Sequence, residues 1–384
     1  MTDTPITAAI VGAGYIAKFH VDAARGVPGV TVRAVCDLNL ERAQRFAQAA
    51  GLEAAYSSVE ALLETEQVDV LHVLTPPHLH ADPVEKALRA GVDVLVEKPM
   101  AHSSALCRKL ADLANEHGRA LGVSHNFLYY EAYTRLVSDL RQGRLGHIDQ
   151  VDIVWNKELG QLSGGPFGAW MLQAPQHILF EVAPHSFAHC HHLIGPLDSV
   201  EARPFDSVTL PGGLRFFRRW EIMGWAGNTS VRIRFSFIEG YPEHYIHLRG
   251  SVASASVDFE RSTYVVHEHT PHLLDVDRYI DVTSSAKDTV AQATGTLARF
   301  VLAKAGVKKV EGEPFGRSIV GSVRAFYDSR GGVIDEGVSP QMGQAAVELA
   351  ERVAKAADLR VSKVIEPRGT TVPPTVRHKP TVLV

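Results

Sequence analysis

A glycine-rich turn near the N-terminus restricts the possible folds of this sequence more than any other feature. Residues 6–12 are an apolar segment typical of a buried strand, and the motif Gly12-x-Gly14-x-x-Ala17 follows at once. Gly12 permits a tight turn, Gly14 lets the backbone approach a pyrophosphate, and Ala17 lets the next helix pack closely, with its N-terminus toward the phosphates. The motif therefore predicts a dinucleotide site. Its predicted contacts are Gly12, Gly14, Tyr15 and Ile16.

An acidic residue indicates which dinucleotide the site takes. The second predicted strand, residues 30–37, ends in Asp37. A carboxylate at this place can accept both ribose hydroxyls of NAD, and it repels the 2′-phosphate of NADP. Arg42 lies one helical turn into the next predicted helix and could instead swing toward such a phosphate. The sequence therefore predicts NAD, with NADP as the weaker alternative.

The order of predicted elements indicates two domains. At 384 residues the chain is longer than a typical single core. Predicted strands and helices first alternate, as in a doubly wound α/β sheet, and long strands then follow one another, which favours an antiparallel sheet in an α+β domain. We expect a Rossmann domain over 1–125, a second domain over 126–358 whose last helix can pack back on the first, and an extended proline-containing tail over 359–384.

The elements expected in the second domain follow from hydrophobic periodicity. The predicted strands are 150–156, 214–225, 230–238, 244–249 and 254–260. The predicted helices are 133–142, 180–194, 289–304, 317–327 and 341–357.

Composition indicates in which compartment the protein works and which kinds of partner it has. A formal net charge of −4 gives no reason to expect nucleic acid or an anionic membrane. The three cysteines, Cys36, Cys107 and Cys190, are widely spaced and indicate no disulfide framework. The N-terminus lacks the basic region of a signal peptide, and no apolar run approaches the ~20 residues that span a bilayer. We therefore expect a cytoplasmic protein with a small-molecule substrate.

A lysine at the end of a later predicted strand is the first candidate for catalysis. In Glu97-Lys98-Pro99 the proline fixes the exit from the strand at 93–97 and favours an extended backbone at Lys98. Ligands of open α/β sheets bind beyond the carboxyl ends of the strands, so the amine would enter that crevice. There Lys98, with Glu97 beside it, would contact the cofactor, and Lys98 would also contact the substrate. The alternative is a solvated surface charge.

The motif Thr75-Pro76-Pro77-x-x-His80 closes the predicted strand at 68–75. Its prolines hold the loop extended across the path of the cofactor. One interpretation makes Thr75, Pro76 and His80 a wall beside the nicotinamide ribose. In the other, His80 merely caps the next helix.

A histidine-rich segment holds the other candidate chemistry. On the helix predicted over 180–194, Glu181, His185 and His189 would share one face. A buried imidazole accepts protons near pH 7, and a carboxylate one turn away can orient it. We therefore assign general-base work to His185, with core packing and a metal site as the alternatives. No metal is predicted, because neither HExxH nor paired cysteines accompany these histidines.

Aromatic residues flank a glycine-rich loop over 160–168. Trp155, Phe167 and Trp170 could stack on sugar rings, or they could simply pack in the core. The predicted substrate contacts are Lys98, Asn126, Trp155, Trp170, Glu181, His185 and His189.

Taken together, these motifs resemble the glucose–fructose oxidoreductase and inositol dehydrogenase (Gfo/Idh/MocA) family over about residues 6–357. The resemblance rests on the Gly12 turn, the Thr75–His80 motif, Glu97-Lys98-Pro99 and an acid four residues before His185. It implies a Rossmann domain and a C-terminal domain with a large, open, mostly antiparallel sheet. It also implies dimers or tetramers that oxidise or reduce sugars or cyclitols with NAD(P), with the catalytic lysine at Lys98 and the histidine at His185.

Two departures from the family pattern concern the histidine segment. The segment Glu181-Val-Ala183-Pro184-His185 stands where the family usually has Asp-x-Gly-x-His, and the longer carboxylate and the proline should shift the acid relative to the substrate. An Ala188-His189 pair occupies a place where the family often has another aspartate. Both differences predict an unusual substrate pocket.

The resulting hypothesis is an NAD-dependent dehydrogenase that acts on a secondary alcohol of a sugar, glycoside or cyclitol. His185 would take the hydroxyl proton, Lys98 would stabilise the developing alkoxide, and Glu181 would orient His185 or bind a neighbouring hydroxyl. Two alternatives remain open. One is an epimerase or glycoside-cleaving enzyme that oxidises its substrate transiently and recycles NAD, and the other is a non-catalytic NAD sensor.

Overall fold

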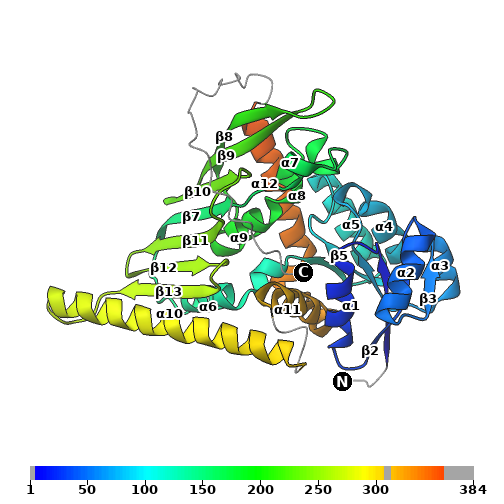
Figure 1. The fold of residues 1–384 in the computed structure, drawn as a ribbon, viewed down its shortest axis with the longest axis horizontal. Coiled ribbons are helices and arrows are strands. Elements are labelled where there is room, and N and C mark those ends of the chain that lie inside the picture. Colours follow the sequence, from blue (N-terminus) through cyan, green and yellow to red (C-terminus); the bar gives the residue numbers. More distant parts are fainter. Residues whose placement is uncertain (1–4, 307–312, 359–384) are drawn as a thin grey trace.

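The computed structural model describes residues 5–306 and 313–358 and contains two sheets (Figure 1). The first sheet has six parallel strands in the order β3-β2-β1-β4-β5-β6. The strand order reverses between β1 and β4, where a doubly wound sheet opens a crevice for its ligand. The strands are β1 (Ile6–Val11), β2 (Val30–Cys36), β3 (Ala54–Tyr56), β4 (Val70–Val73), β5 (Asp93–Glu97) and β6 (Leu121–Ser124).

Side-chain caps begin several helices between these strands. Asn39, Ser58 and Ser103 each precede a helix, and each side chain accepts a hydrogen bond from a backbone N–H of the first turn. The helices are α1 (Ala17–Arg25), α2 (Leu40–Ala50), α3 (Val59–Thr65), α4 (Ala81–Arg89) and α5 (Ser104–Glu116), with 3₁₀ turns η1 (Pro77–Leu79) and η2 (Asn126–Tyr129).

The second sheet has seven strands in the order β13-β12-β11-β7-β10-β9-β8. Neighbouring strands are antiparallel except for β7 and β10, which run parallel. Buried and half-exposed side chains alternate along β10 and β12, as expected for a sheet with one covered face. The strands are β7 (Ile148–Asn156), β8 (Ser199–Thr209), β9 (Arg215–Ala226), β10 (Thr229–Ser236), β11 (Glu243–Gly250), β12 (Ala253–Asp258) and β13 (Thr263–Glu268).

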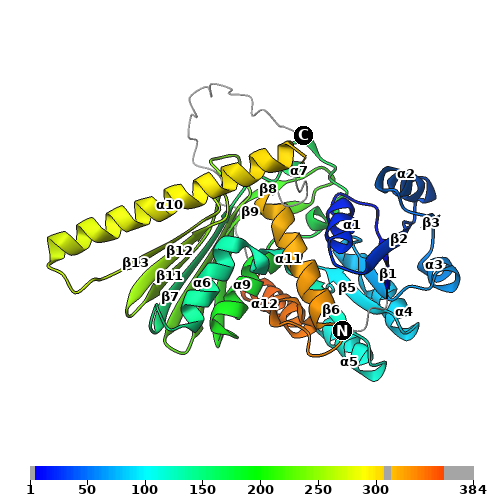
Figure 2. The same cartoon turned by 90° about the horizontal axis from the view of Figure 1, so that it is seen from below.

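Helices cover one face of the second sheet and one of its edges. Figure 2 shows α6, α9 and α12 on the same side of the strands, while the long helix α10 runs beside the edge strand β13. The helices are α6 (Glu131–Arg141), α7 (Gln161–Gly164), α8 (Ile178–Glu181), α9 (Pro184–Ile194), α10 (Leu274–Lys304), α11 (Pro314–Ser329) and α12 (Pro340–Ala356), with 3₁₀ turns η3 (Trp170–Leu172) and η5 (Glu336–Val338).

The last two helices join the two sheets. Helix α11 packs on α1 and β6, and α12 packs on α5, β6 and α9. These close approaches depend on small residues. A Cβ added to Gly122 in β6 would lie 2.4 Å from Cδ2 of Phe326 on α11, and one added to Gly343 on α12 would lie 2.7 Å from Cγ2 of Val123. The domain boundaries given above remain predictions, since one large apolar core runs through both parts.

The predicted fold class is confirmed: a parallel Rossmann sheet precedes a mostly antiparallel second sheet. Two edge strands of the second sheet, β8 and β13, were not predicted, nor were β3 and α3. Helix α10 begins at Leu274, well before the predicted residue 289. The single helix predicted over 180–194 is wrong. It is two helices, because Pro184 has no N–H to continue a helix and instead begins α9.

Two smaller observations bear on the expectations from composition. Cys36, Cys107 and Cys190 are all buried and free. Among the described helices, none combines the length and the apolar character needed to cross a membrane. The tail predicted over 359–384 lies outside the described residues.

Candidate active site

The glycine-rich turn has the geometry that a dinucleotide needs. Gly12 has φ +102°, and a Cβ there would lie 2.8 Å from the backbone carbonyl of Leu74, so only glycine fits without strain. A Cβ on Gly14 would meet nothing within 4 Å, which leaves open space above the turn at the N-terminus of α1. Tyr15 is 81% exposed at the rim, and Ile16 is the residue before α1. These residues fit a bound pyrophosphate.

Asp37 stands at the end of β2, and its acceptor positions are already in use. Its carboxylate accepts hydrogen bonds from the backbone N–H groups of Ala13 and Asn39 and from Nε and Nη2 of Arg42. Burial raises the pKa of Asp37, but these hydrogen bonds outweigh it and hold that pKa below its usual value. Ribose hydroxyls can reach the carboxylate only if the Arg42 side chain, which is 55% exposed, moves aside.

Lys98 connects the two halves of the site. It follows β5, and its Nζ atom donates a 2.9 Å hydrogen bond to the backbone carbonyl of Glu181 at the end of α8. The lysine is half-buried, so it is not the solvated surface charge of the alternative interpretation. The contact brings a strand end of the first sheet against the segment that carries His185.

A buried chain of hydrogen bonds holds Glu97, the residue before Lys98. Its Oε1 atom lies 3.0 Å from Nε2 of His20, and Nδ1 of His20 lies 3.0 Å from Nδ1 of His72. Nε2 of His72 lies 3.0 Å from the hydroxyl of Tyr327 on α11. The chain therefore ties the end of β5 to α1, β4 and the C-terminal part of the protein.

His80 stands at the N-cap position of α4, where the second interpretation put it, but it does not cap the helix through its side chain. It is fully buried, and its side chain makes no capping bond to α4. Its Nδ1 atom lies 2.7 Å from the carbonyl of Pro99, and its Nε2 atom lies 2.6 Å from the carbonyl of Thr75. His80 thus joins the loops after β4 and β5, and of the four residues that define its motif, Thr75 and Pro76 are the two that are not buried.

Aromatic rings set the position of His185 near the start of α9. Its imidazole is parallel to Trp155 within 2°, with ring centroids 5.6 Å apart, and Phe127 meets it edge-on at 4.7 Å. The side chain is 9% exposed, and Nδ1 has no hydrogen-bond partner among the described residues. Burial, followed by the charge of Lys98, lowers the pKa of His185 well below its usual value. At neutral pH it is therefore a free base.

Glu181 does not orient His185 through Nδ1, contrary to one of its two expected roles. It ends α8, whereas His185 belongs to α9, and it is the Glu181 main chain that Lys98 contacts. The other expected role, binding a neighbouring hydroxyl, stays a prediction.

His189 belongs to a buried histidine cluster rather than to an open pocket. It is fully buried, neither ring nitrogen has a partner among the described residues, and burial lowers its pKa to about 3. His244, on β11, is equally without partners and stacks on Phe259 at 4.1 Å. His125, at the end of β6 near Lys98, has its pKa lowered by burial to about 4.

Sequence reasoning missed His125 and His244. His125 could have been found from its position at the end of a predicted strand, directly before Asn126. No local signal marks His244, because only the pairing of β11 with β7 brings it beside Trp155, at 4.2 Å.

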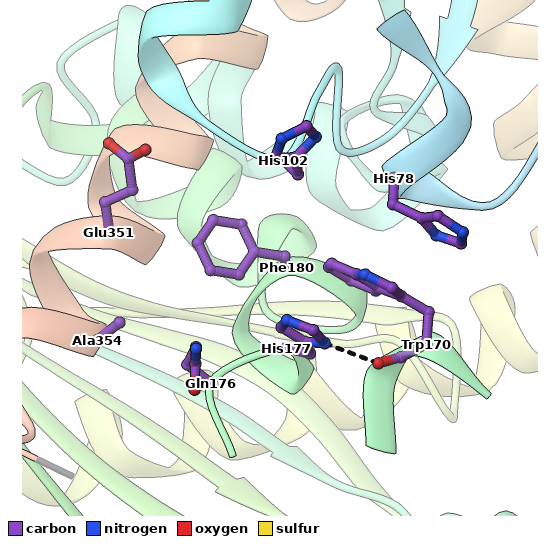
Figure 3. Close-up of a pocket in the computed structure, with 8 residues that line it drawn as sticks. All are labelled: His78, His102, Trp170, Gln176, His177, Phe180, Glu351 and Ala354. Atoms are coloured by element: carbon purple, nitrogen blue, oxygen red, sulfur yellow. Dashed lines mark hydrogen bonds between the residues drawn. The ribbon is translucent and has the colours of Figure 1, made fainter. Parts of the chain in front are cut away.

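The remaining predicted substrate contacts lie on two sides of this cluster. Asn126 is buried, and its amide donates a 2.9 Å hydrogen bond to Ser318 on α11. Trp170 lies farther out, between two imidazole rings (Figure 3). Across residues 5–306 and 313–358, no group of three or more histidine, cysteine or acidic side chains could hold a metal ion.

A comparison with protein-family models agrees with the dinucleotide-binding geometry of the first sheet. The model of the Gfo/Idh/MocA oxidoreductase family, described as having an NAD-binding Rossmann fold, matches residues 6–125.

Curated relatives are similar over part of the chain. The D-glucoside 3-dehydrogenase of Escherichia coli is 30% identical over 213 residues, which cover 51% of this chain and 60% of the relative. The D-apiose dehydrogenase of Paraburkholderia graminis is 30% identical over 159 residues, which cover 41% and 42%. The chain spans about half the length of the curated relatives it matches.

Solved structures share the whole fold. Levoglucosan dehydrogenase, in complex with NADH and levoglucosan, matches with a TM-score of 0.77 over 92% of this chain and 97% of the other. The two sequences are 16% identical, so this likeness concerns the fold alone.

Proposed function

We propose that this chain is an NAD-dependent dehydrogenase, because residues 6–125 match the model of the Gfo/Idh/MocA oxidoreductase family with its NAD-binding Rossmann fold. Its proposed substrate is a sugar, glycoside or cyclitol, oxidised at a secondary hydroxyl. The hydrogen bond from Lys98 Nζ to the Glu181 carbonyl carries this proposal, since it places an amine from the first sheet beside the segment that holds His185. The sugar relatives support the choice of substrate class.

The NAD site is formed by the turn at Gly12 and Gly14, the N-terminus of α1 and Asp37. Bound there, NAD supplies the hydride acceptor for the oxidation. Thr75 and Pro76 would line the path of the cofactor past the end of β4, and Glu97 and Lys98 would border it at the end of β5.

His185 and Lys98 divide the proton chemistry between them. His185, a neutral imidazole fixed by Trp155, takes the proton from the substrate hydroxyl. Lys98 donates a hydrogen bond to the same oxygen as negative charge develops on it. The lysine can do so by exchanging its bond to the Glu181 carbonyl for one to the substrate.

Turnover assays test this proposal directly. We expect the purified protein to form NADH from NAD and at least one member of a panel of sugars, glycosides and cyclitols. A product that forms without net NADH would replace the proposal by transient oxidation with NAD recycling. NAD binding without any product would replace it by a sensor.

The pairing of Asp37 with Arg42 leads to a prediction on cofactor choice. We expect the wild type to bind NAD more tightly than NADP. Asp37→Ala should narrow this preference at least several-fold, because it removes the ribose acceptor and frees Arg42 for the 2′-phosphate. Titrations of both cofactors measure the effect.

Arg42→Ala is the matched control, and it should act in the opposite direction. It frees the buried Asp37 carboxylate from its ion pair with Arg42, so NAD binding should tighten by a few-fold while NADP binding weakens. Tighter binding of NADP than NAD by the wild type would contradict the assignment.

We also propose that the chain forms a homodimer or homotetramer. Exposed apolar side chains along α10, including Val282, Val290 and Leu297, support this expectation, since a contact between subunits would remove them from water.

A further inference from the structure

A cavity of about 530 Å³ lies between the two halves of the chain, beside the candidate active site. The loop after β4 and the turn before α5 form one wall, and the segment 170–180 and helix α12 form the other (Figure 3). Its size falls within the range of small-molecule pockets, roughly 300–1,000 Å³. The proposed function so far assigns it nothing.

One short chain segment links the cavity to the proposed reacting groups. Phe180, which lines it, directly precedes Glu181, and the Glu181 carbonyl accepts the hydrogen bond from Lys98. A sugar whose hydroxyl lies at Lys98 would therefore have its further substituents next to this space.

Flat rings form most of the wall. The ring of Trp170 stacks on His177, with centroids 4.2 Å apart and planes 10° apart, and also on His78, at 5.8 Å and 15°. Nδ1 of His177 lies 2.8 Å from the Trp170 carbonyl and fixes this arrangement. The Phe180 ring lies between Trp170 and the Glu351 side of the cavity (Figure 3). Because an imidazole covers each face of Trp170, the Phe180 ring is the one in this wall that can receive a planar apolar group.

The charges around the cavity favour a neutral ligand. Among the described residues that line it there is no lysine or arginine. The Glu351 carboxylate already accepts hydrogen bonds from the N–H and hydroxyl of Ser104, at the N-terminus of α5. Partial burial, with His102 and His177, lowers the pKa of His78 although Glu181 raises it. A nucleotide diphosphate would bring negative charge here without a cationic partner.

We propose that this cavity binds the uncharged aromatic aglycone of a glycoside whose sugar ring lies at Lys98 and His185. The inference rests on the proposed function, since it names the substrate class of the same site. Proton removal and hydride transfer remain at the sugar, and the aglycone contributes binding energy alone.

A pair of alanine substitutions on α12 tests the aglycone site. Ala354 lines the cavity and is half-buried, so Ala354→Phe should fill it, whereas Ala356→Phe places the same ring on the exposed face of the helix. Calorimetry would measure binding of phenyl and methyl β-D-glucopyranoside to each protein in the presence of NAD. We expect the wild type and Ala356→Phe to bind the phenyl glycoside at least about tenfold more tightly than the methyl glycoside. Ala354→Phe should bring the two affinities within about twofold.

NADH formation, followed separately, distinguishes this inference from the proposed function. Selective phenyl binding that is lost in Ala354→Phe would support the cavity whether or not NADH forms, and the dehydrogenase would be overturned if no member of the wider panel gave NADH. NADH formation with equal binding of both glycosides, or no binding of the phenyl glycoside, would overturn the aglycone site. UDP-glucose that binds more tightly than the phenyl glycoside and is weakened by Ala354→Phe would also overturn it. If Ala354→Phe melts at a lower temperature than the wild type, Trp170→Leu, which removes an aromatic ring of the wall at the start of η3, takes its place.

Discussion

Replacing Lys98 by alanine should lower kcat about a thousandfold while NAD binding stays intact. Only Lys98 in this site brings a positive charge from the end of β5 to the segment before His185, so it acts on charge that develops during the reaction. The loss should therefore appear in kcat more than in KM. Steady-state kinetics and an NAD titration measure both effects.

Two further variants separate this role from a structural one. Lys98→Met keeps the length of the side chain and should be as inactive as Lys98→Ala. Lys109→Ala removes an exposed lysine of α5 that pairs with Glu85, and it should leave kcat unchanged. Near wild-type kcat in either Lys98 variant would remove this residue from the mechanism.

His185→Asn should lower kcat by about 10²–10⁴, the usual contribution of a general base. Asparagine keeps a polar side chain of moderate size on α9 but accepts no proton. Comparison of thermal unfolding and NAD binding with the wild type checks that the fold survives. His191→Asn, on the same helix but half-buried away from Trp155, is the control and should retain activity.

The pH profile gives an independent test of the same role. Burial lowers the pKa of His185, and the charge of Lys98 and the neighbouring His125, His244 and His189 lower it further. The active form is the unprotonated one, so activity should stay constant as pH falls through 6.5, the usual histidine pKa, and decline only below it. An acid limb above pH 6.5 that persists in His185→Asn would assign the base to another group.

Chelation separates a base from a metal ligand at this helix. If His185 is the base, activity should survive exhaustive treatment with a chelator. Loss of turnover, together with about one metal ion per chain by elemental analysis, would instead assign these histidines to a metal site.

Local features explain why the first sheet and its cofactor could be predicted. The turn at Gly12 needs a conformation that only glycine adopts freely, and the strand before it and the helix after it are adjacent in sequence. The same is true of Lys98, whose place at a strand end follows from the apolar run before it and Pro99 after it. The second sheet was predicted in part. Its edge strand β8 was missed because Pro204 and charged side chains interrupt its hydrophobic alternation.

The arrangement of the candidate site depends on contacts between distant residues. Lys98 and Glu181 are 83 positions apart, and His72 and Tyr327 are 255 apart. No spacing in the sequence encodes these pairs, because they form only when α8 and α11 pack against the ends of β5 and β4.

The sequence by itself thus determined the fold class, the cofactor and the two residues proposed for proton chemistry, since each depends on a short motif. Only the tertiary structure decided how these residues are oriented. It gave His185 aromatic neighbours instead of a carboxylate partner, made His80 a bridge between two loops, and lined a cavity with the rings of Trp170, His177 and Phe180. The physical reason is that burial and ring stacking are set by the packing of elements from both sheets, which local sequence does not specify.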